Sequence, residues 1–165
     1  MTLAIEELNP RVHERKSFDY GSEQLNRYLR DLAAQHRGKG IATTFVLIDD
    51  ADARTVLGFY SLSAASLTFE TIEESDRKRL PAYPIPAVRI GRLAVSLSAK
   101  GHGFGELLLQ NAIKRTLAAR TTMGMFAIIV EAKDDRAAAF YRKYGFRPCN
   151  VEDRQLYLPL GRDEA

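Results

Sequence analysis

The stretch that most restricts the fold of this chain is a glycine-rich hexapeptide, Lys100 to Gly105. It lies between residues 88–95, which read as a central strand, and residues 105–120, whose apolar spacing predicts a helix. Glycines let a backbone approach an anion, and the start of a helix offers N–H groups that have no acceptor within the helix. The hexapeptide therefore predicts a pyrophosphate site or, alternatively, a tight turn that needs glycine only for its backbone. Its spacing excludes a Walker loop and a dinucleotide-binding G-x-G-x-x-G loop.

The rest of the sequence predicts a mixed succession of helices and strands. We expect a helix over residues 22–36, an antiparallel hairpin over 43–48 and 56–67, a short helix over 72–80, a strand over 125–130, a helix over 134–144 and a closing strand over 155–160. Pro81, Pro84 and Pro86 exclude a helix before the central strand and mark an irregular approach to it. Because no repeat or low-complexity linker interrupts this order, we expect one α/β domain over residues 1–165.

The composition is that of a globular protein, with 45% hydrophobic and 27% charged residues. Cys149 is the only cysteine, so no intrachain disulfide can form, and a structural role is favoured over a nucleophilic one. No stretch approaches the roughly 20 apolar residues of a membrane span, and no basic segment followed by a long apolar run comes after Met1. We therefore expect a soluble, cytoplasmic protein with no membrane partner.

Two separated motifs resemble those of one enzyme family. Lys100 to Gly105, preceded by Arg92-Leu93-Ala94-Val95, resembles the Q/R-x-x-G-x-G/A motif of the GNAT acetyltransferases. Residues Ala139 to Phe146 resemble the second signature of that family, A-x-x-x-Y-x-x-x-G-F. The resemblance covers nearly the whole chain. It implies the GNAT fold, in which a mostly antiparallel central sheet has helices on both faces and a splayed strand pair holds acetyl-CoA.

The same resemblance assigns the cofactor-binding residues. It implies that Leu93, Ala94 and Val95 offer strand backbone to the pantetheine arm, with the backbone at Val95 polarising the thioester carbonyl. The pyrophosphate would be held by Lys100, Gly101, His102, Gly103, Phe104 and Gly105. Lys100 stands where the family usually has Gln or Arg, and its ammonium cannot make a planar bidentate contact. We therefore expect the backbone N–H groups to contribute more than the Lys100 side chain.

Tyr141 matches the motif tyrosine that serves as the catalytic acid, which protonates the departing thiolate. From periodicity alone it would be a core tyrosine on the helix face that also carries Phe140 and Tyr144, and Tyr144 is expected only to pack. Glu131 is a weaker candidate for a base, with pairing to a nearby arginine as the alternative. His13, His36 and His102 are scattered, so metal-dependent chemistry is not expected.

The segment Phe18 to Leu29 resembles the opening of GNAT toxins, although Asn26 stands in the usual Asp position. These toxins acetylate the α-amino group of aminoacyl-tRNA, stop translation and are neutralised by a small DNA-binding antitoxin of the ribbon-helix-helix type. The resemblance implies the same acceptor and antitoxin here, and we also expect a homodimer. Grouped cations are candidate contacts to the RNA backbone: Arg27, Arg30, Arg37, Lys39, Arg77, Lys78, Arg79, Arg89 and Arg92.

Two other functions stay open at this stage. The chain could be a small-molecule or protein N-acetyltransferase, in which case these cations are ordinary solvated surface. It could also be a non-catalytic, CoA-binding regulatory partner of a DNA-binding antitoxin. The presence of both Tyr141 and the glycine-rich loop favours an enzyme.

Overall fold

The computed structural model describes residues 1–149 and 154–161. Its strands follow the order β1-β2-β3-β4-β5-β7-β6 in one sheet. The chain divides into two compact units, Met1–Ser63 with Ile90–Lys114, and Ala64–Arg89 with Arg115–Ala165. Helices and strands together form the mixed α/β architecture expected from the sequence. The single domain over residues 1–165 stays a prediction.

The strands of the first unit pair antiparallel. β1 (Leu3–Glu7) pairs with β2 (Thr43–Asp49), and β2 pairs with β3 (Gly58–Leu67). The hairpin expected from residues 43–67 is thereby confirmed. Apolar residues stand at positions 3, 5 and 8, but the sequence predicts no strand there, because Leu3-Ala4-Ile5 followed by Glu6-Glu7 does not alternate between apolar and polar residues.

One helical stretch covers residues 23–38 of the first unit. It consists of α1 (Glu23–Arg27), a π-helical turn over Tyr28–Leu32, and α2 (Ala33–Gly38). This confirms the expected helix, which starts after Ser22 and is followed by Gly40 at φ 71°. The π turn carries Tyr28 and Leu29, 1% and 0% exposed, in the apolar cluster with Phe59 and Ala94.

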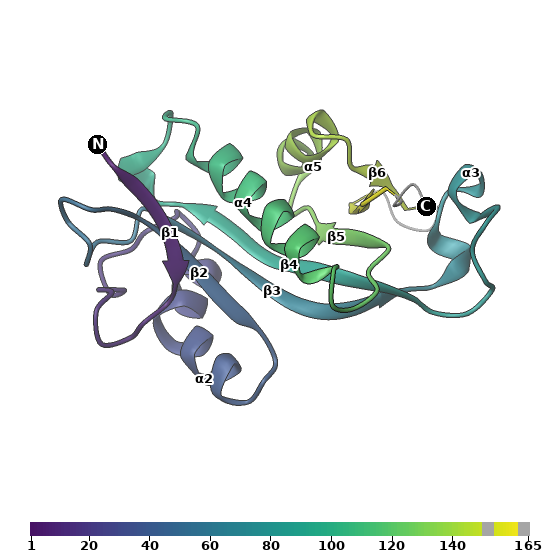
Figure 1. Cartoon of the computed structure of the whole chain (residues 1–165). Coiled ribbons are helices and arrows are strands. Elements are labelled where there is room, and N and C mark those ends of the chain that lie inside the picture. The colour runs from purple at the N-terminus through teal and green to yellow at the C-terminus, as the bar shows by residue number, and fades with distance from the viewer. Residues whose placement is uncertain (150–153, 162–165) are drawn as a thin grey trace. The chain divides into compact units, whose positions relative to one another are not determined.

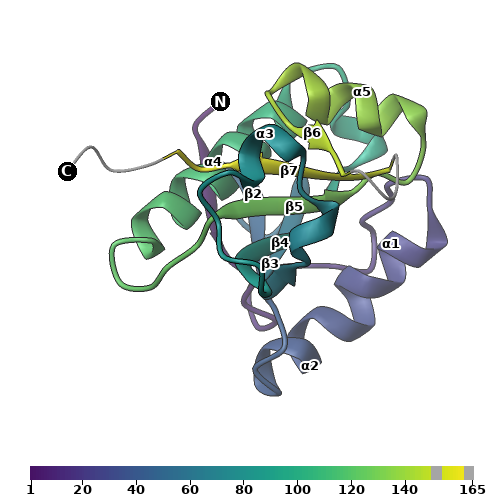
Figure 2. The same ribbon diagram turned by 90° about the vertical axis from the view of Figure 1, so that its right-hand side faces the viewer.

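The stretch over residues 23–38 lies on one face of the strands of this unit. Helix α4 (Phe104–Ala119) covers their other face, as both views in Figures 1 and 2 show. The hydroxyl of Tyr60 on β3 donates to Oδ1 of Asn111 on α4 at 2.5 Å. A Cβ added at Gly58 would lie 2.8 Å from the carbonyl oxygen of Ala94 and 2.9 Å from Leu108. Only glycine therefore fits at the start of β3, where α4 and the strand that ends at Val95 approach it. In this unit, as expected, helices lie on both faces of the strands.

The second unit is built on β5 (Ala127–Glu131), β7 (Gln155–Pro159) and β6 (Arg147–Pro148). β7 lies between the other two and is antiparallel to both (Figure 2). The strands expected over 125–130 and 155–160 are confirmed, and β6 is too short for its pattern to be recognised. Cys149 is 4% exposed and belongs to the core cluster of this unit with Ile129 and Tyr157, which supports a structural role for the thiol.

The short helix and the strand expected over residues 72–80 and 88–95 are present, but with other bounds. The helix expected over 72–80 is only α3 (Glu74–Arg77), preceded by a 3-10 turn over Phe69–Thr71. β4 (Ile85–Val95) begins three residues earlier than expected and includes Pro86. Proline lacks the N–H but keeps its carbonyl, and that carbonyl accepts a hydrogen bond from the N–H of Phe126 at 2.9 Å. A proline near the start of a strand therefore does not exclude pairing on its carbonyl side.

The last helix, α5 (Asp135–Lys143), begins where the sequence predicts. Asp134 is its N-cap, and the carboxylate accepts a hydrogen bond from the N–H of Ala137 at 2.8 Å. Among the described residues, no helix has both the length and the apolar character needed to cross a membrane.

Candidate active site

Two residues of the glycine-rich loop have a backbone conformation that residues with a Cβ rarely adopt. Gly101 and Gly103 have φ values of 88° and 76°, in the left-handed region. A Cβ added at either position would meet nothing within 4 Å. Glycine is therefore needed at both positions for conformation rather than for room, and the space beside these two residues is open to a ligand.

The start of α4 offers hydrogen-bond donors at the end of this loop. The first backbone N–H of the helix with an acceptor among the described residues is that of Leu107, which donates to the carbonyl of Gly103 at 3.2 Å. The N–H groups of Phe104, Gly105 and Glu106 precede it in the first turn, where no intrahelical acceptor exists. Such groups, beside glycines with open space, fit the chemistry of a pyrophosphate.

The side chains of the loop differ in their surroundings. Phe104 is 5% exposed and anchors the start of α4 in the core. His102 is exposed, and its ring stacks on that of Phe104 with 5.5 Å between the centroids. Lys100 is also exposed, and its Nζ lies 4.5 Å from the centroid of the Tyr20 ring. The Glu106 carboxylate accepts a hydrogen bond from Gln110 at 3.2 Å.

The end of β4 leads into the loop through a short 3-10 turn, Leu97–Ala99. Ala94 is 1% exposed and packs in the core, whereas Leu93 and Val95 are half-buried. The N–H of Ser96 donates to the carbonyl of Leu57 at 2.8 Å, which fixes this end of the strand. The binding of pantetheine by residues 93–95, and the splay of the strand pair, stay predictions.

The second motif is a helix C-terminus with a defined hydrogen-bond pattern. Gly145, at φ 95°, donates its N–H to the carbonyl of Arg142 at 3.0 Å, and Phe146 donates to the carbonyl of Tyr141 at 3.2 Å. These two bonds, around a left-handed glycine, form a Schellman motif. The ring of Phe146 packs against that of Tyr141, with 5.3 Å between centroids. The Y-x-x-x-G-F spacing is therefore the spacing of this cap, and the cap holds the tyrosine in place.

Tyr141 belongs to the second unit and is 8% exposed. Its ring is enclosed by Phe140 and Phe146, each 5.3 Å away between centroids. Tyr144 is half-buried and contacts Phe140 at 5.2 Å, in agreement with a packing role. The aromatic surroundings expected for a core tyrosine are thus present, and the catalytic role of Tyr141 stays a prediction.

The carboxylate of Glu131 is exposed and pairs with Arg89 at 3.3 Å. The arginine partner considered for Glu131 therefore exists, and the carboxylate has a structural contact independent of any substrate. Two histidines also have local contacts, since His13 Nε2 lies 3.3 Å from Glu6 and His36 Nδ1 lies 3.2 Å from the Tyr28 hydroxyl.

The candidate RNA-binding cations divide into three groups. Three pair with carboxylates: Arg30 with Glu23 and Asp31, Arg37 with Glu7, and Arg89 with Glu131. Two lie over aromatic rings: Arg92 over Tyr28 at 3.7 Å and Arg77 over Phe69 at 5.6 Å. The other four are exposed and have no ion pair or ring contact within residues 1–149 and 154–161: Arg27, Lys39, Lys78 and Arg79.

A buried polar network of the second unit was not foreseen from the sequence. The Tyr157 side chain is 0% exposed, its hydroxyl donates to Asp76 at 2.6 Å, and it accepts from the N–H of Glu73 at 3.0 Å. Asp76 also pairs with Arg147 at 2.6 Å. Burial, with the hydrogen bond to Asp76 as a second cause, raises the pKa of Tyr157 well above its ordinary value of 10.0. The network ties α3 to β6 and β7, and no local sequence pattern signals such long-range partners.

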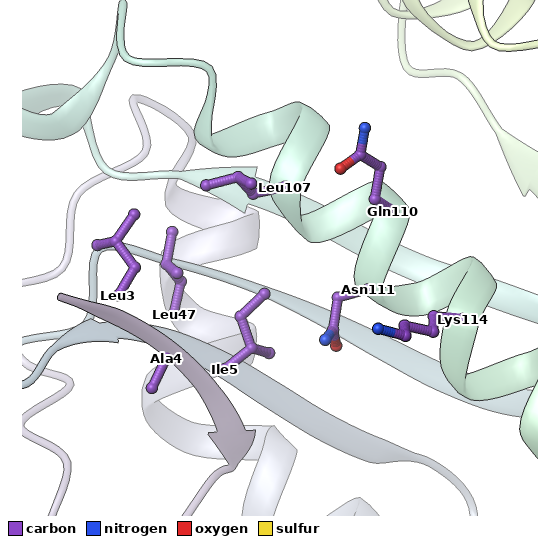
Figure 3. A pocket seen from close by; sticks show the side chains of 8 residues that line it. All are labelled: Leu3, Ala4, Ile5, Leu47, Leu107, Gln110, Asn111 and Lys114. Carbon is purple, nitrogen blue, oxygen red and sulfur yellow. The ribbon is translucent and has the colours of Figure 1, made fainter.

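A pocket of about 310 Å³ lies between β1 and α4 in the first unit (Figure 3). Its residues are Leu3, Ala4, Ile5, Leu47, Leu107, Gln110, Asn111 and Lys114. Figure 3 shows Asn111 pointing toward the strands and Gln110 pointing away from them. None of these residues is among the predicted cofactor or RNA contacts.

A family profile described as "Acetyltransferase (GNAT) domain" matches residues 42–148, which include both motifs. This chain belongs to the GNAT acetyltransferase family. It is 35% identical to a tRNA-acetylating toxin of Mycobacterium tuberculosis over 142 residues, which cover 86% of this chain and 83% of that protein. It is 26% identical over 164 residues to the probable toxin TacT of Sinorhizobium fredii, covering 94% of this chain and 90% of that protein.

Solved structures of toxins match nearly the whole GNAT chain. A tyrosine-to-phenylalanine mutant of KacT matches with a TM-score of 0.90 and 26% identity, covering 97% of this chain and 96% of that one. AtaT in complex with acetyl-methionyl-tRNAfMet matches with a TM-score of 0.88 and 31% identity, covering 96% and 95%. AtaTR bound with acetyl-CoA matches with a TM-score of 0.81 and 33% identity, covering 96% and 94%. Another AtaT structure includes the C-terminus of the antitoxin AtaR.

Proposed function

We propose that this GNAT acetyltransferase transfers the acetyl group of acetyl-CoA to the α-amino group of aminoacyl-tRNA and acts as the toxin of a toxin-antitoxin pair. The observation that carries the proposal is the likeness over nearly the full chain to AtaT, a toxin solved with an acetylated aminoacyl-tRNA. The glycine-rich loop, the Schellman cap next to Tyr141 and the exposed cations agree with this proposal.

Acetyl-CoA, when bound, supplies the activated acetyl thioester. We propose that the N–H groups of Gly101 to Gly105, with the Lys100 ammonium, hold its phosphates, since this loop combines open space with donors at a helix start. Strand backbone at Leu93, Ala94 and Val95 is proposed to hold the pantetheine arm. A donor at Val95 would stabilise negative charge on the carbonyl oxygen during acyl transfer.

Tyr141 is proposed as the general acid, with its phenol donating a proton to the sulfur that departs. The Schellman cap at Gly145 and Phe146 supports this role, because it fixes the helix turn that carries the tyrosine. The α-amine of an aminoacyl ester has a low pKa, so a large fraction is already neutral at physiological pH and needs little help from a base. Glu131 is not required, which agrees with its pairing to Arg89.

The nine candidate cations are proposed to contact the RNA backbone, with different costs. Arg27, Lys39, Lys78 and Arg79 are exposed and can meet phosphates directly. Arg30, Arg37 and Arg89 must exchange a carboxylate for a phosphate, and exposed ion pairs of this kind are weak enough for that exchange. Arg77 and Arg92 would have to leave their aromatic rings or reach past them.

The remaining features of the proposal concern the whole protein. We propose that residues 1–165 act as one domain, that two chains form a homodimer, and that a small ribbon-helix-helix antitoxin neutralises the enzyme in the cytoplasm. The likeness to AtaT bound to the C-terminus of its antitoxin supports an antitoxin partner.

The acceptor is tested by offering purified protein and labelled acetyl-CoA to bulk aminoacyl-tRNA, uncharged tRNA, polyamines and peptides with free N-termini. We expect label only on aminoacyl-tRNA, at an amide that survives after the ester is hydrolysed. Label on a polyamine or peptide instead would establish a small-molecule or protein acetyltransferase. Binding of CoA without transfer to any acceptor would favour a non-catalytic regulatory partner.

A further inference from the structure

Two segments that are distant in the sequence meet next to the glycine-rich loop. The N–H of Leu97 donates to the carbonyl of Asp19 at 2.8 Å. Gly21 has φ 98°, and a Cβ added there would lie 3.4 Å from the Leu97 side chain. One turn further on, the ammonium of Lys100 lies over the ring of Tyr20 at 4.5 Å. Residues 19–21 therefore support the turn from which the loop starts.

Asn26 braces residues 19–21 with both ends of its amide. Its Nδ2 donates to Oδ1 of Asp19 at 3.0 Å, and its Oδ1 accepts from the N–H of Tyr20 at 2.8 Å. The same Asp19 oxygen accepts from the N–H of Gly21 at 2.8 Å. An ionised aspartate at position 26 could accept from Tyr20 but could not donate to Asp19, and two carboxylates would then face each other.

The segment is also anchored in the core. Phe18 is 6% exposed, and its ring packs edge-on against Phe59 on β3 with 5.5 Å between centroids. Tyr20 is therefore held from both sides, by Phe18 before it and by the Asn26 brace after it. A lysine side chain is flexible, whereas an ammonium resting on a fixed ring has fewer positions available.

We infer that Tyr20 and Asn26 are positioning residues for Lys100, and that they hold its ammonium where it meets a phosphate of CoA. The inference rests on the proposed function only for the assignment of the loop to CoA. A lysine held in advance loses less freedom on binding, so it contributes more than a free lysine in the same place. This positioning also explains how Lys100 binds a phosphate where the family usually has the planar side chain of Gln or Arg.

A ring that attracts the ammonium has the opposite effect when it keeps the ammonium away from the ligand. The two cases predict opposite signs. If Tyr20 positions Lys100, removing the ring weakens CoA binding. If Tyr20 withholds it, removing the ring strengthens CoA binding, and the inference is overturned.

The test measures CoA affinity by titration calorimetry on the full chain, which requires no turnover. We expect Lys100→Ala and Tyr20→Leu each to weaken binding, the latter about two- to five-fold, the range of an exposed cation–π contact. Tyr20→Phe keeps the ring and should bind like the wild type. Asn26→Asp should weaken binding in the same range as Tyr20→Leu. Tyr83→Leu, at a tyrosine that is 62% exposed in the other unit, is the matched control and should change nothing.

The decisive comparison is the double variant Tyr20→Leu/Lys100→Ala. Because Tyr20 acts through Lys100, the double variant should bind CoA as Lys100→Ala does, with no further loss. Equal losses from Tyr20→Leu with and without Lys100 would overturn the inference, and so would an unchanged affinity in Lys100→Ala. Thermal unfolding of each variant separates these effects from loss of the fold. Wild-type protein that binds no CoA would contradict the cofactor assignment itself, whereas binding without aminoacyl-tRNA acetylation would contradict only the acceptor.

Discussion

Single glycines of the phosphate loop can be separated from other exposed glycines by substitution. Gly103 is left-handed and borders open space, so Gly103→Asp adds both backbone strain and a negative charge where phosphates are proposed to bind. We expect CoA affinity to fall more than ten-fold, measured by calorimetry. Gly124→Asp is the control, because this glycine also borders open space but lacks a left-handed backbone. The CoA affinity of this variant should stay unchanged. Equal affinities in the two variants would remove the loop from the cofactor site.

Tyr157 gives a prediction about pH. Its pKa is raised in the folded protein, so the folded state keeps the phenol proton after the unfolded chain has lost it near pH 10.0. The stability from this group is therefore complete below that pH and is lost as the pH rises above it. We expect the free energy of unfolding to fall more steeply above about pH 10 in the wild type than in Tyr157→Phe. Tyr83→Phe, at an exposed tyrosine, should keep the wild-type slope.

The sequence identifies residue types at the site better than their partners. Gly101, Gly103 and Gly145 are recognised because a left-handed backbone leaves a local mark, a glycine at a fixed offset from a helix end. The contacts of Lys100 with Tyr20 and of Tyr157 with Asp76 join distant parts of the chain. No spacing rule encodes such pairs, so they emerge only from the fold.

At the scale of elements, the Schellman cap of α5 yields a stability prediction. Gly145→Ala puts a Cβ on a residue at φ 95°, which costs about 1–2 kcal/mol of unfolding free energy. We expect this loss in chemical denaturation, together with reduced acetyl transfer, because the same cap fixes Tyr141. Gly38→Ala at the end of α2, where φ is not left-handed and nothing lies within 4 Å of the added Cβ, should be neutral or slightly stabilising. A neutral Gly145→Ala would contradict the role of the cap.

Elements with a clear apolar pattern were predictable, and elements without one were not. α4 and the hairpin of β2 and β3 follow their apolar patterns within a few residues. A 3.6-residue apolar period does not predict the π turn at Tyr28–Leu32, since this turn only widens the helix locally. β1 and β6 are strands chiefly because neighbouring strands pair with them. Pro86 misled the prediction, because its missing N–H says nothing about its carbonyl.

At the scale of the whole molecule, family membership and fold followed from two motifs in the correct order, and the match to residues 42–148 confirms the family. The acceptor is a different question, because GNAT enzymes share the cofactor loop whatever amine they acetylate. Its assignment depends on likeness to toxins over the full chain and on cations, most of which have intramolecular contacts. Acetyl transfer to the proposed acceptor, aminoacyl-tRNA, is therefore the direct test.

That test compares the rate of acetyl transfer to aminoacyl-tRNA by the wild type, Tyr141→Phe and Tyr144→Phe, with saturating acetyl-CoA. Both tyrosines lie in the same aromatic cluster with Phe140, so the two variants lose the same atom from similar surroundings. We expect Tyr141→Phe to reduce kcat about 10²- to 10⁴-fold, as for loss of a general acid, with unchanged CoA affinity. Tyr144→Phe should keep most of the activity. Wild-type protein that leaves aminoacyl-tRNA unlabelled, or Tyr141→Phe with the wild-type rate, would contradict the proposed mechanism.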